Sequence, residues 1–365
     1  MAAGFNSSVT RDQLSGVTGL NVIDILCIVL NGITMVITLS GNFIVIVCAL
    51  KYEILKVRPA NYFSFSLAVA DLGIGLSLAM EIATLARPEL LYVKNLCVFR
   101  ILLMLISMLN SVFCLLCIVC DRVVCIYDPL HYHLIMTRKR CLAITSVTWL
   151  TSLLQTIPAI FWNVFSPQRK CYAHDFLIRE HLLVIAFQPI LGVIVQAVCY
   201  GWIATVAWQK IRDWKSTQFV EMPDLPVTDD QGKTTPPANA GQTGDNKSKT
   251  TRPKRLFAAF EKEIHLTKNM CLLVGLFAVC WLPLCSITIY DEMVTSQPTV
   301  VVHSNAKRLT LPLSVINSAI NPCIYAWKLP EYRAAIFKLF RRSNRQRRLF
   351  QENAVTEINN SSEST

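Results

Sequence analysis

Apolar residues gather in seven long segments along the chain, and a polar stretch separates each segment from the next. A helix needs about 20 mainly apolar residues to cross the hydrocarbon core of a bilayer, because lipid offers no partner for backbone N–H and C=O groups. Seven segments meet this condition: Val22–Leu50, Ala60–Thr84, Cys97–Tyr127, Cys141–Trp162, His181–Trp208, Ile264–Tyr290 and Leu309–Trp327. The pattern predicts an all-α membrane protein, a seven-transmembrane helix bundle.

The polar segments divide the chain into regions. The first span follows about twenty polar residues, which is typical of an uncleaved signal anchor and not of a secretory signal peptide. One long connection is rich in Pro, Gly, Thr, Asn and Asp, a composition that favours disorder. We therefore expect an extracellular N-terminus at 1–21, a seven-transmembrane domain at 22–327 with a disordered third cytoplasmic loop at 213–252, an amphipathic eighth helix at 328–342 and a disordered cytoplasmic tail at 343–365.

Charge supports this arrangement and sets its direction. Only 16% of the 365 residues are charged, whereas soluble domains carry about 25%. The net charge of +11 is typical of nucleic-acid binding as well, but most Lys and Arg lie in alternate connections and in the tail. The positive-inside rule places those regions in the cytoplasm, so we expect an outer N-terminus, a plasma-membrane location and no nucleic-acid partner. Asn6 begins a glycosylation sequon on the predicted outer side.

The predicted eighth helix has apolar residues on one side and basic residues on the other. Its apolar residues are Ile336, Phe337, Leu339 and Phe340, and a run of arginines follows them. A helix of this kind lies in the membrane interface, where membrane lipid is its partner. A merely solvated charge run is the alternative reading of the arginines.

Fourteen cysteines raise the question of disulfides. Most lie within apolar spans, where cysteine behaves as a small buried hydrophobic residue. Cys97 opens the third span and Cys171 precedes the fifth, so both fall on the predicted oxidising side. A disulfide between them is expected, and free thiols are the alternative.

Asp71 lies midway along the second span, where an ionisable group is costly and normally faces the bundle interior. Polar residues on the first, third and seventh spans are its expected neighbours: Asn42, Ser111, Asn317, Ser318 and Asn321. Their oxygen atoms suit a small hard cation or a water cluster. A purely structural polar network is the alternative.

Charged residues also stand at the predicted cytoplasmic ends of two spans. Asp121 and Arg122 end the third span, and Glu263 begins the sixth. An Arg122–Glu263 pair is expected to act as a latch between the two spans, because exposed ion pairs contribute only about 0–1 kcal/mol and break readily. A static ion pair is the alternative. Pro283 and Pro322 are expected to kink the sixth and seventh spans, either as hinges or as fixed bends.

Several short motifs follow one another in a fixed order through the spans. They are Gly41-Asn42, Leu67-Ala68-Val69-Ala70-Asp71, Asp121-Arg122, Trp149, Cys280-Trp281-Leu282-Pro283 and Asn321-Pro322-Cys323-Ile324-Tyr325. Together they resemble the motifs of the rhodopsin-like (class A) G-protein-coupled receptors, over residues 22–342. The resemblance implies that an extracellular small molecule binds the outer half of the bundle, that the sixth span swings outward, and that a heterotrimeric G protein docks inside. It also implies arrestin binding to a phosphorylated tail.

The resemblance assigns an activation role to a set of residues on the third, fifth, sixth and seventh spans. They are Asp121, Arg122, Glu263, Tyr200, Phe277, Trp281, Pro283, Asn321, Pro322 and Tyr325. Two positions depart from the family pattern. Val123 replaces the tyrosine that follows Asp-Arg, and Gly192 stands near the usual proline of the fifth span.

A narrower resemblance is to the adenosine receptors, through Lys262-Glu263-Ile264-His265, Val274-Gly275-Leu276-Phe277-Ala278 and Ser111-Val112-Phe113. It implies an allosteric sodium ion at Asp71, Ser111, Asn317 and Ser318, next to Trp281. The departures fall in the ligand site. Thr288, Ala173, His174, Val315 and Asn31 replace, in that order, the adenosine-gripping asparagine, the aromatic platform, its acidic neighbour, a histidine and a glutamate. They remove the contacts that recognise adenine.

Two ionisable residues are predicted at the depth of the ligand pocket. Glu81 and Arg100 either pair with each other, or Arg100 offers a carboxylate or phosphate of the ligand a two-pronged contact. The apolar floor is expected to consist of Met104, Met108, Trp281, Leu284, Cys285 and Thr288, with Ser314 and Val315 beside it. Met104 is not an aspartate, and Val315 is not a lysine. A monoamine receptor and a light-sensing opsin are therefore not expected.

The sequence as a whole predicts an adenosine-receptor-like G-protein-coupled receptor, with no catalytic residues and no cofactor beyond the sodium ion. A signalling-silent orphan receptor is one alternative, motivated by Val123. A transporter or channel is another, because Asp71 and its polar neighbours suit an ion path. The paired inverted halves typical of transporters are not found in the sequence.

Overall fold

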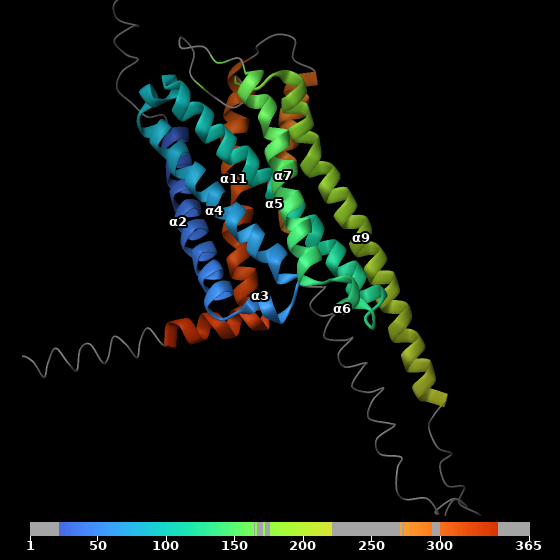
Figure 1. Ribbon diagram of the computed structural model, residues 1–365. Helices are drawn as coiled ribbons and strands as arrows, with labels where there is room; N and C mark the ends of the chain where they lie inside the picture. The colour runs from blue at the N-terminus through green and yellow to red at the C-terminus, as the bar shows by residue number, and fades with distance from the viewer. Residues whose placement is uncertain are drawn as a thin grey trace, which may run out of the picture.

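The computed structural model of the protein describes residues 22–163, 165, 171, 176–220, 271, 274–293 and 300–341. Long helices dominate it (Figure 1). The labelled elements are α2 (Val22–Lys51), α3 (Ile54–Val57), α4 (Asn61–Ala86), the 3₁₀ helix η1 (Pro88–Tyr92), α5 (Lys94–Tyr127), α6 (Tyr132–Ile135), α7 (Arg138–Phe161), α9 (Arg179–Val220) and α11 (Val300–Lys328). Two further helices cover Val274–Met293 and residues 330–341.

The long helices stand side by side as one bundle (Figure 1). α5 packs against α4, α7 and α9, while α2 packs against α4 and α11. The short helices α3 and α6 lie at one end of the bundle, which we call the α6 end. The helix at residues 330–341 lies across the α6 end at a steep angle to α11, and the opposite end, near η1, is called the η1 end (Figure 1).

Six helices of the described chain are long and apolar enough to cross a membrane: α2, α4, α5, α7, α9 and Val274–Met293. Large apolar side chains such as Val36, Val147 and Val198 are exposed, while many polar side chains face inward. This distribution is the reverse of that in a water-soluble protein. α11 packs against α2 and α4 and is the seventh long helix of the bundle. The structure therefore confirms the predicted all-α fold with multiple membrane spans.

The helices extend beyond several predicted spans. α9 reaches Val220, so its last turns occupy the first residues of the segment predicted to be disordered. α11 begins at Val300, nine residues before the predicted Leu309. Bilayer thickness fixes how many apolar residues a span needs, but a helix continues into polar sequence until a breaker stops it. Along the chain, the next proline after Pro189 of α9 is Pro223.

Glycine permits a close approach between α2 and α11. A Cβ atom added to Gly41 would lie 2.9 Å from both Cβ and Cγ of Pro322. Real Cβ contacts are longer than this, so any larger residue at position 41 must push α11 away. Gly41 therefore fixes the distance at which the polar side chains of α2 and α11 can meet.

We expect Gly41→Ala to lower the melting temperature of the detergent-purified protein by about 2–6 °C, since overpacking costs about 1–3 kcal/mol. The matched control on the same helix is Gly32→Ala, because no atom lies within 4 Å of a Cβ at Gly32. That control should leave the melting temperature unchanged or raise it, since alanine favours a helix over glycine. Equal effects of the two substitutions would contradict the proposed close approach.

Candidate functional site

Arg100 and Glu81 form an ion pair between α5 and α4 near the η1 end. The side chain of Arg100 is buried, and its Nη2 donates a hydrogen bond to the backbone carbonyl of Cys171 at 2.8 Å. The structure thus has the charge-neutralising arrangement that the sequence left open as one of two alternatives. The guanidinium links α4, α5 and the segment at Cys171.

A disulfide joins Cys97 of α5 to Cys171, with a Cα–Cα distance of 6.1 Å. Cys171 also donates its backbone N–H to the carbonyl oxygen of Leu91 at 3.1 Å. Both cysteines are buried against apolar side chains that include Phe176 and Leu177. Cys171 is therefore held over the η1 end of α5 by a covalent bond, a backbone hydrogen bond and the Arg100 contact.

Only some of the residues predicted to form the floor of the ligand pocket lie together in the structure. Val315 of α11 is buried with Ile74 and Leu78 of α4, and Met104 and Met108 pack on them. The Ser77 hydroxyl contacts the Met104 sulfur at 3.0 Å, which ties Met104 further to α4.

The remaining floor residues belong to other surroundings. Trp281 and Cys285 are part of the large central apolar cluster, and the Trp281 ring stacks on Phe277 at a centroid distance of 5.7 Å. Leu284 and Thr288 are half-buried on the same helix. Ser314 donates its hydroxyl to the carbonyl of Leu311 within α11.

A second ion pair near the η1 end was missed in the sequence. Lys307 Nζ lies 2.7 Å from Asp291 Oδ2, and both side chains are about 85% buried, being 15% and 14% exposed. The pair joins α11 to the helix at Val274–Met293. Lys307 lay outside the predicted seventh span, so its charge was assigned to a loop. The feature of the sequence that could have predicted this pair is the presence of opposite charges at the facing ends of two consecutive spans.

The centre of the bundle holds Asp71, which is fully buried. Asn321 Nδ2 of α11 donates to Asp71 Oδ2 at 2.8 Å. Asn42 Nδ2 of α2 donates to the backbone carbonyl of Ser318 at 3.1 Å and to that of Thr38 at 3.0 Å. These bonds connect α2, α4 and α11 in a medium that offers no other partner.

Three oxygen atoms in this layer remain without a hydrogen-bond partner: Oδ1 of Asp71, of Asn42 and of Asn321. Ser111, Asn317 and Ser318 are buried residues on the neighbouring turns of α5 and α11. Carboxylate, amide and hydroxyl oxygens are the ligands that hard cations prefer. The residues present therefore fit the expected sodium ion, which stays a prediction.

A polar cluster between α4, α5 and α7 gives Trp149 a defined role. Trp149 Nε1 of α7 donates to Ser66 Oγ of α4 at 3.0 Å, and Asn110 Nδ2 of α5 lies 3.4 Å from the same oxygen. The sequence motifs include Trp149 but not Asn110. An amide side chain within an apolar stretch was the feature of the sequence that could have identified Asn110.

At the α6 end, Arg122 forms an ion pair with the neighbouring Asp121, and its Nε donates to Asp121 Oδ2 at 2.9 Å. Tyr132 of α6 donates its hydroxyl to the other carboxylate oxygen of Asp121 at 2.7 Å. Burial and the charge of Asp121 raise the pKa of Tyr132, so this phenol keeps its proton and remains a donor. Glu263 lies outside the described residues, and the Arg122–Glu263 latch stays a prediction.

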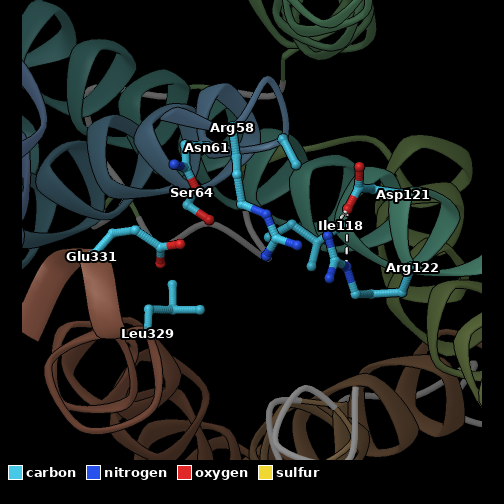
Figure 2. A pocket seen from close by; sticks show the side chains of 9 residues that line it. Arg58, Asn61, Ser64, Ile118, Asp121, Arg122, Leu329 and Glu331 are labelled. Carbon is cyan, nitrogen blue, oxygen red and sulfur yellow. Dashed lines mark hydrogen bonds and ion pairs between the residues drawn. The ribbon is translucent and has the colours of Figure 1, made fainter. Parts of the chain in front are cut away.

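A cavity opens at the α6 end beside this ion pair. Its volume is about 430 Å³, including open solvent, and its lining residues come from the turn before α4, from α4 and α5, and from the chain after α11: Arg58, Ala60, Asn61, Ser64, Ile118, Asp121, Arg122, Leu329 and Glu331. The side chains of Arg58 and Arg122 extend toward the middle of the cavity, and Glu331 faces them from the other side (Figure 2). The cavity is thus lined by two cations, Arg58 and Arg122, and two carboxylates, Asp121 and Glu331.

Two buried tyrosines lie close to the cavity. Tyr325 of α11 stacks on Tyr332 of the helix at residues 330–341, with a centroid distance of 5.7 Å. Both are fully buried, which fixes that helix against the bundle. Tyr200 of α9 and Phe277 are buried in the same central cluster, next to half-buried Val123.

Asn6 lies outside the described residues, so its glycosylation stays a prediction.

This bundle has a buried aspartate at its centre, a disulfide at one end and an Asp-Arg cavity at the other. The description "7 transmembrane receptor (rhodopsin family)" belongs to a family model that matches residues 41–325, which is most of the chain. The chain therefore belongs to the rhodopsin family of seven-transmembrane receptors, which are not enzymes.

Within that family the chain is similar to adenosine receptors. It is 28% identical to adenosine receptor A2a of Canis lupus familiaris over 294 residues, which cover 77% of this chain and 64% of the relative. It is 27% identical to adenosine receptor A2b of Gallus gallus over 339 residues, covering 86% and 87%. Adenosine receptor A2a of Homo sapiens is 26% identical over 294 residues, with coverages of 77% and 64%. The chain thus spans less than two thirds of the A2a relatives' length.

The sodium site is testable by thermal unfolding of the purified protein. We expect sodium chloride to raise the melting temperature by about 2–4 °C over choline chloride at the same ionic strength, because a ligand that binds only the folded state stabilises it. Asp71→Asn removes the charge that attracts the cation and should abolish this difference. An equal response of the variant and the native protein would rule out Asp71 as the cation ligand.

Proposed function

We propose that the protein is a plasma-membrane receptor that passes an extracellular small-molecule signal to heterotrimeric G proteins. The α6 end would face the cytoplasm, with the C-terminal tail on that side and the N-terminus outside. The observation that carries the proposal is the cavity at the α6 end, where Arg122 and Arg58 face Glu331. A partner helix that carries both charged and apolar residues would complement such a lining.

The ion pairs support a movable bundle. Arg122 is bonded to Asp121 on its own helix, and Tyr132 holds the same carboxylate from α6. A partner entering the cavity would compete for these bonds. The Asp121–Arg122 pair is buried, so a partner shifts the population of conformations by offering these side chains replacement hydrogen bonds.

The other partners follow from the α6 end as well. Phe337 and Phe340 are exposed on the helix at residues 330–341 and would bury their rings in the membrane interface. The tail at 343–365 carries several serines and would bind arrestin once phosphorylated.

The function is tested by agonist-free nucleotide exchange on a panel of purified G proteins, with the receptor reconstituted in vesicles. We expect exchange above that of empty vesicles for at least one G protein, and no ion flux in the same vesicles. Ile118→Arg replaces an apolar lining residue with a bulky charged one that obstructs the cavity, and should abolish exchange. Flux without exchange would favour a transporter or channel. Absence of both, even after Val123→Tyr, would favour a signalling-silent receptor.

We further propose that the ligand binds near the η1 end and that Arg100 contacts it. A guanidinium presents five N–H donors in a planar fork, and a ligand carboxylate or phosphate would bind it in competition with Glu81. The adenine contacts of the relatives are replaced at Thr288 and Val315. An anionic small molecule therefore fits this site better than adenosine does.

A screen of nucleosides, nucleotides and small carboxylates through a promiscuous G protein would identify an agonist. With that agonist, Arg100→Ala should raise the half-maximal concentration at least about tenfold, because a buried charged contact contributes about 1.5–3 kcal/mol. Glu81→Gln should lower it, since it removes a competitor for the guanidinium. If both variants instead lose surface expression equally, the pair only holds α4 to α5.

A further inference from the structure

Gln196 of α9 is fully buried in the membrane-spanning part of the bundle. Neither its Oε1 nor its Nε2 has a hydrogen-bond partner. A primary amide can make up to four hydrogen bonds, and burying it with none made is unfavourable where neither water nor lipid headgroups reach. Neither the sequence motifs nor the relatives' names assign this residue a role.

The surroundings of Gln196 explain why it lacks a partner. A Cβ atom placed on Gly192, one turn earlier on α9, would lie 3.8 Å from Gln196 Nε2 and 3.1 Å from Val112 Cγ1 of α5. The amide nitrogen therefore lies at the interface of α9 with α5, beside Val112. Val112 belongs to the central apolar cluster that also contains Phe277 and Trp281. Hydrocarbon side chains of this kind offer an amide nothing to bond.

Several buried hydroxyl groups of the long helices, unlike the amide of Gln196, are satisfied within their own helix. On α7, Thr156 Oγ1 donates to the carbonyl of Ser152 at 2.7 Å, and Ser152 Oγ donates to that of Thr148 at 2.9 Å. Their short side chains reach the preceding turn of their own helix. Gln196 has a longer side chain that is directed into the bundle and makes no such bond. Tyr200, one turn later on α9, likewise has a buried hydroxyl without a partner.

We propose that Gln196 destabilises the closed bundle and thereby sets the level of agonist-independent signalling. The proposal rests on the proposed function, in which movement of the helix at Val274–Met293 opens the cavity at the α6 end. That movement loosens the central apolar cluster that contains Phe277, Val112 and Tyr200, and admits water to the amide. The amide then gains hydrogen bonds that the closed bundle denies it, so the open state is favoured relative to a receptor with an apolar residue here.

The test is Gln196→Met, which keeps the volume and the unbranched shape but removes the hydrogen-bonding groups. We expect the melting temperature of the purified receptor to rise by about 2–4 °C. Basal nucleotide exchange on the responsive G protein should fall by about fivefold or more. Thr156→Val is the matched control, since the Thr156 hydroxyl is already satisfied, and it should neither raise the melting temperature nor lower basal exchange.

A distance measurement makes the proposal independent of any G protein. Spin labels at Lys139→Cys on α7 and at the exposed Cys271, with Cys120→Ser and Cys323→Ser to remove other exposed thiols, report the separation of these two helices by pulsed electron resonance. Gln196→Met should reduce the population at long distance. If exchange is absent for all G proteins but this population still falls, the proposed function fails, while the destabilisation of the closed bundle by Gln196 stands.

The opposite result would overturn the inference. If Gln196→Met lowers the melting temperature or leaves it unchanged, and the distance distribution matches that of the native receptor, then Gln196 only fills space between α9 and α5. The same conclusion follows if Thr156→Val shifts both quantities as much as Gln196→Met does.

Discussion

Asp71 and Asn321 meet across the middle of the bundle, and the hydrogen bond between them orders the helices around it. A carboxylate inside a membrane protein has no water to solvate it, so polar groups on the neighbouring helices stabilise it. Asn321 reaches it from α11, while Asn42 of α2 binds the backbone of α11 one turn away at Ser318. The close contact of Gly41 with Pro322 brings these groups within reach.

Charge is layered along the same axis. Arg100 with Glu81 and Lys307 with Asp291 neutralise each other toward the η1 end, and Arg122 with Asp121 does so at the α6 end. Each pair except the last joins two different helices. The first two pairs therefore brace neighbouring helices against each other, whereas Asp121 pairs with Arg122 within α5 and accepts a hydrogen bond from Tyr132 of α6. This asymmetry suits the proposed receptor function, in which the α6 end moves.

The polar centre, the disulfide and the Asp-Arg end all lie within residues 41–325, the part of the chain that matches the rhodopsin family. By resemblance to the adenosine receptors, Thr288, Val315 and Ala173 are expected at positions that recognise the ligand, and the residue types differ there. A buried polar contact discriminates strongly between ligands, so a few such changes alter specificity while leaving the fold intact.

The sequence alone determined the fold class and the approximate spans, because apolar segments longer than the bilayer is thick have only helical solutions in lipid. It also identified Asp71, Arg122 and the pair of cysteines, since charge inside a span and thiols outside one stand out in a linear pattern. The sequence did not show where α9 and α11 end, because polar residues continue a helix beyond the membrane. It also did not show which side chains pair: Arg100 pairs with Glu81 and Lys307 with Asp291, whereas Gln196 has no partner. Which side chains meet depends on the rotation and tilt of each helix, and contacts such as Gly41 with Pro322 decide these only once the bundle has packed.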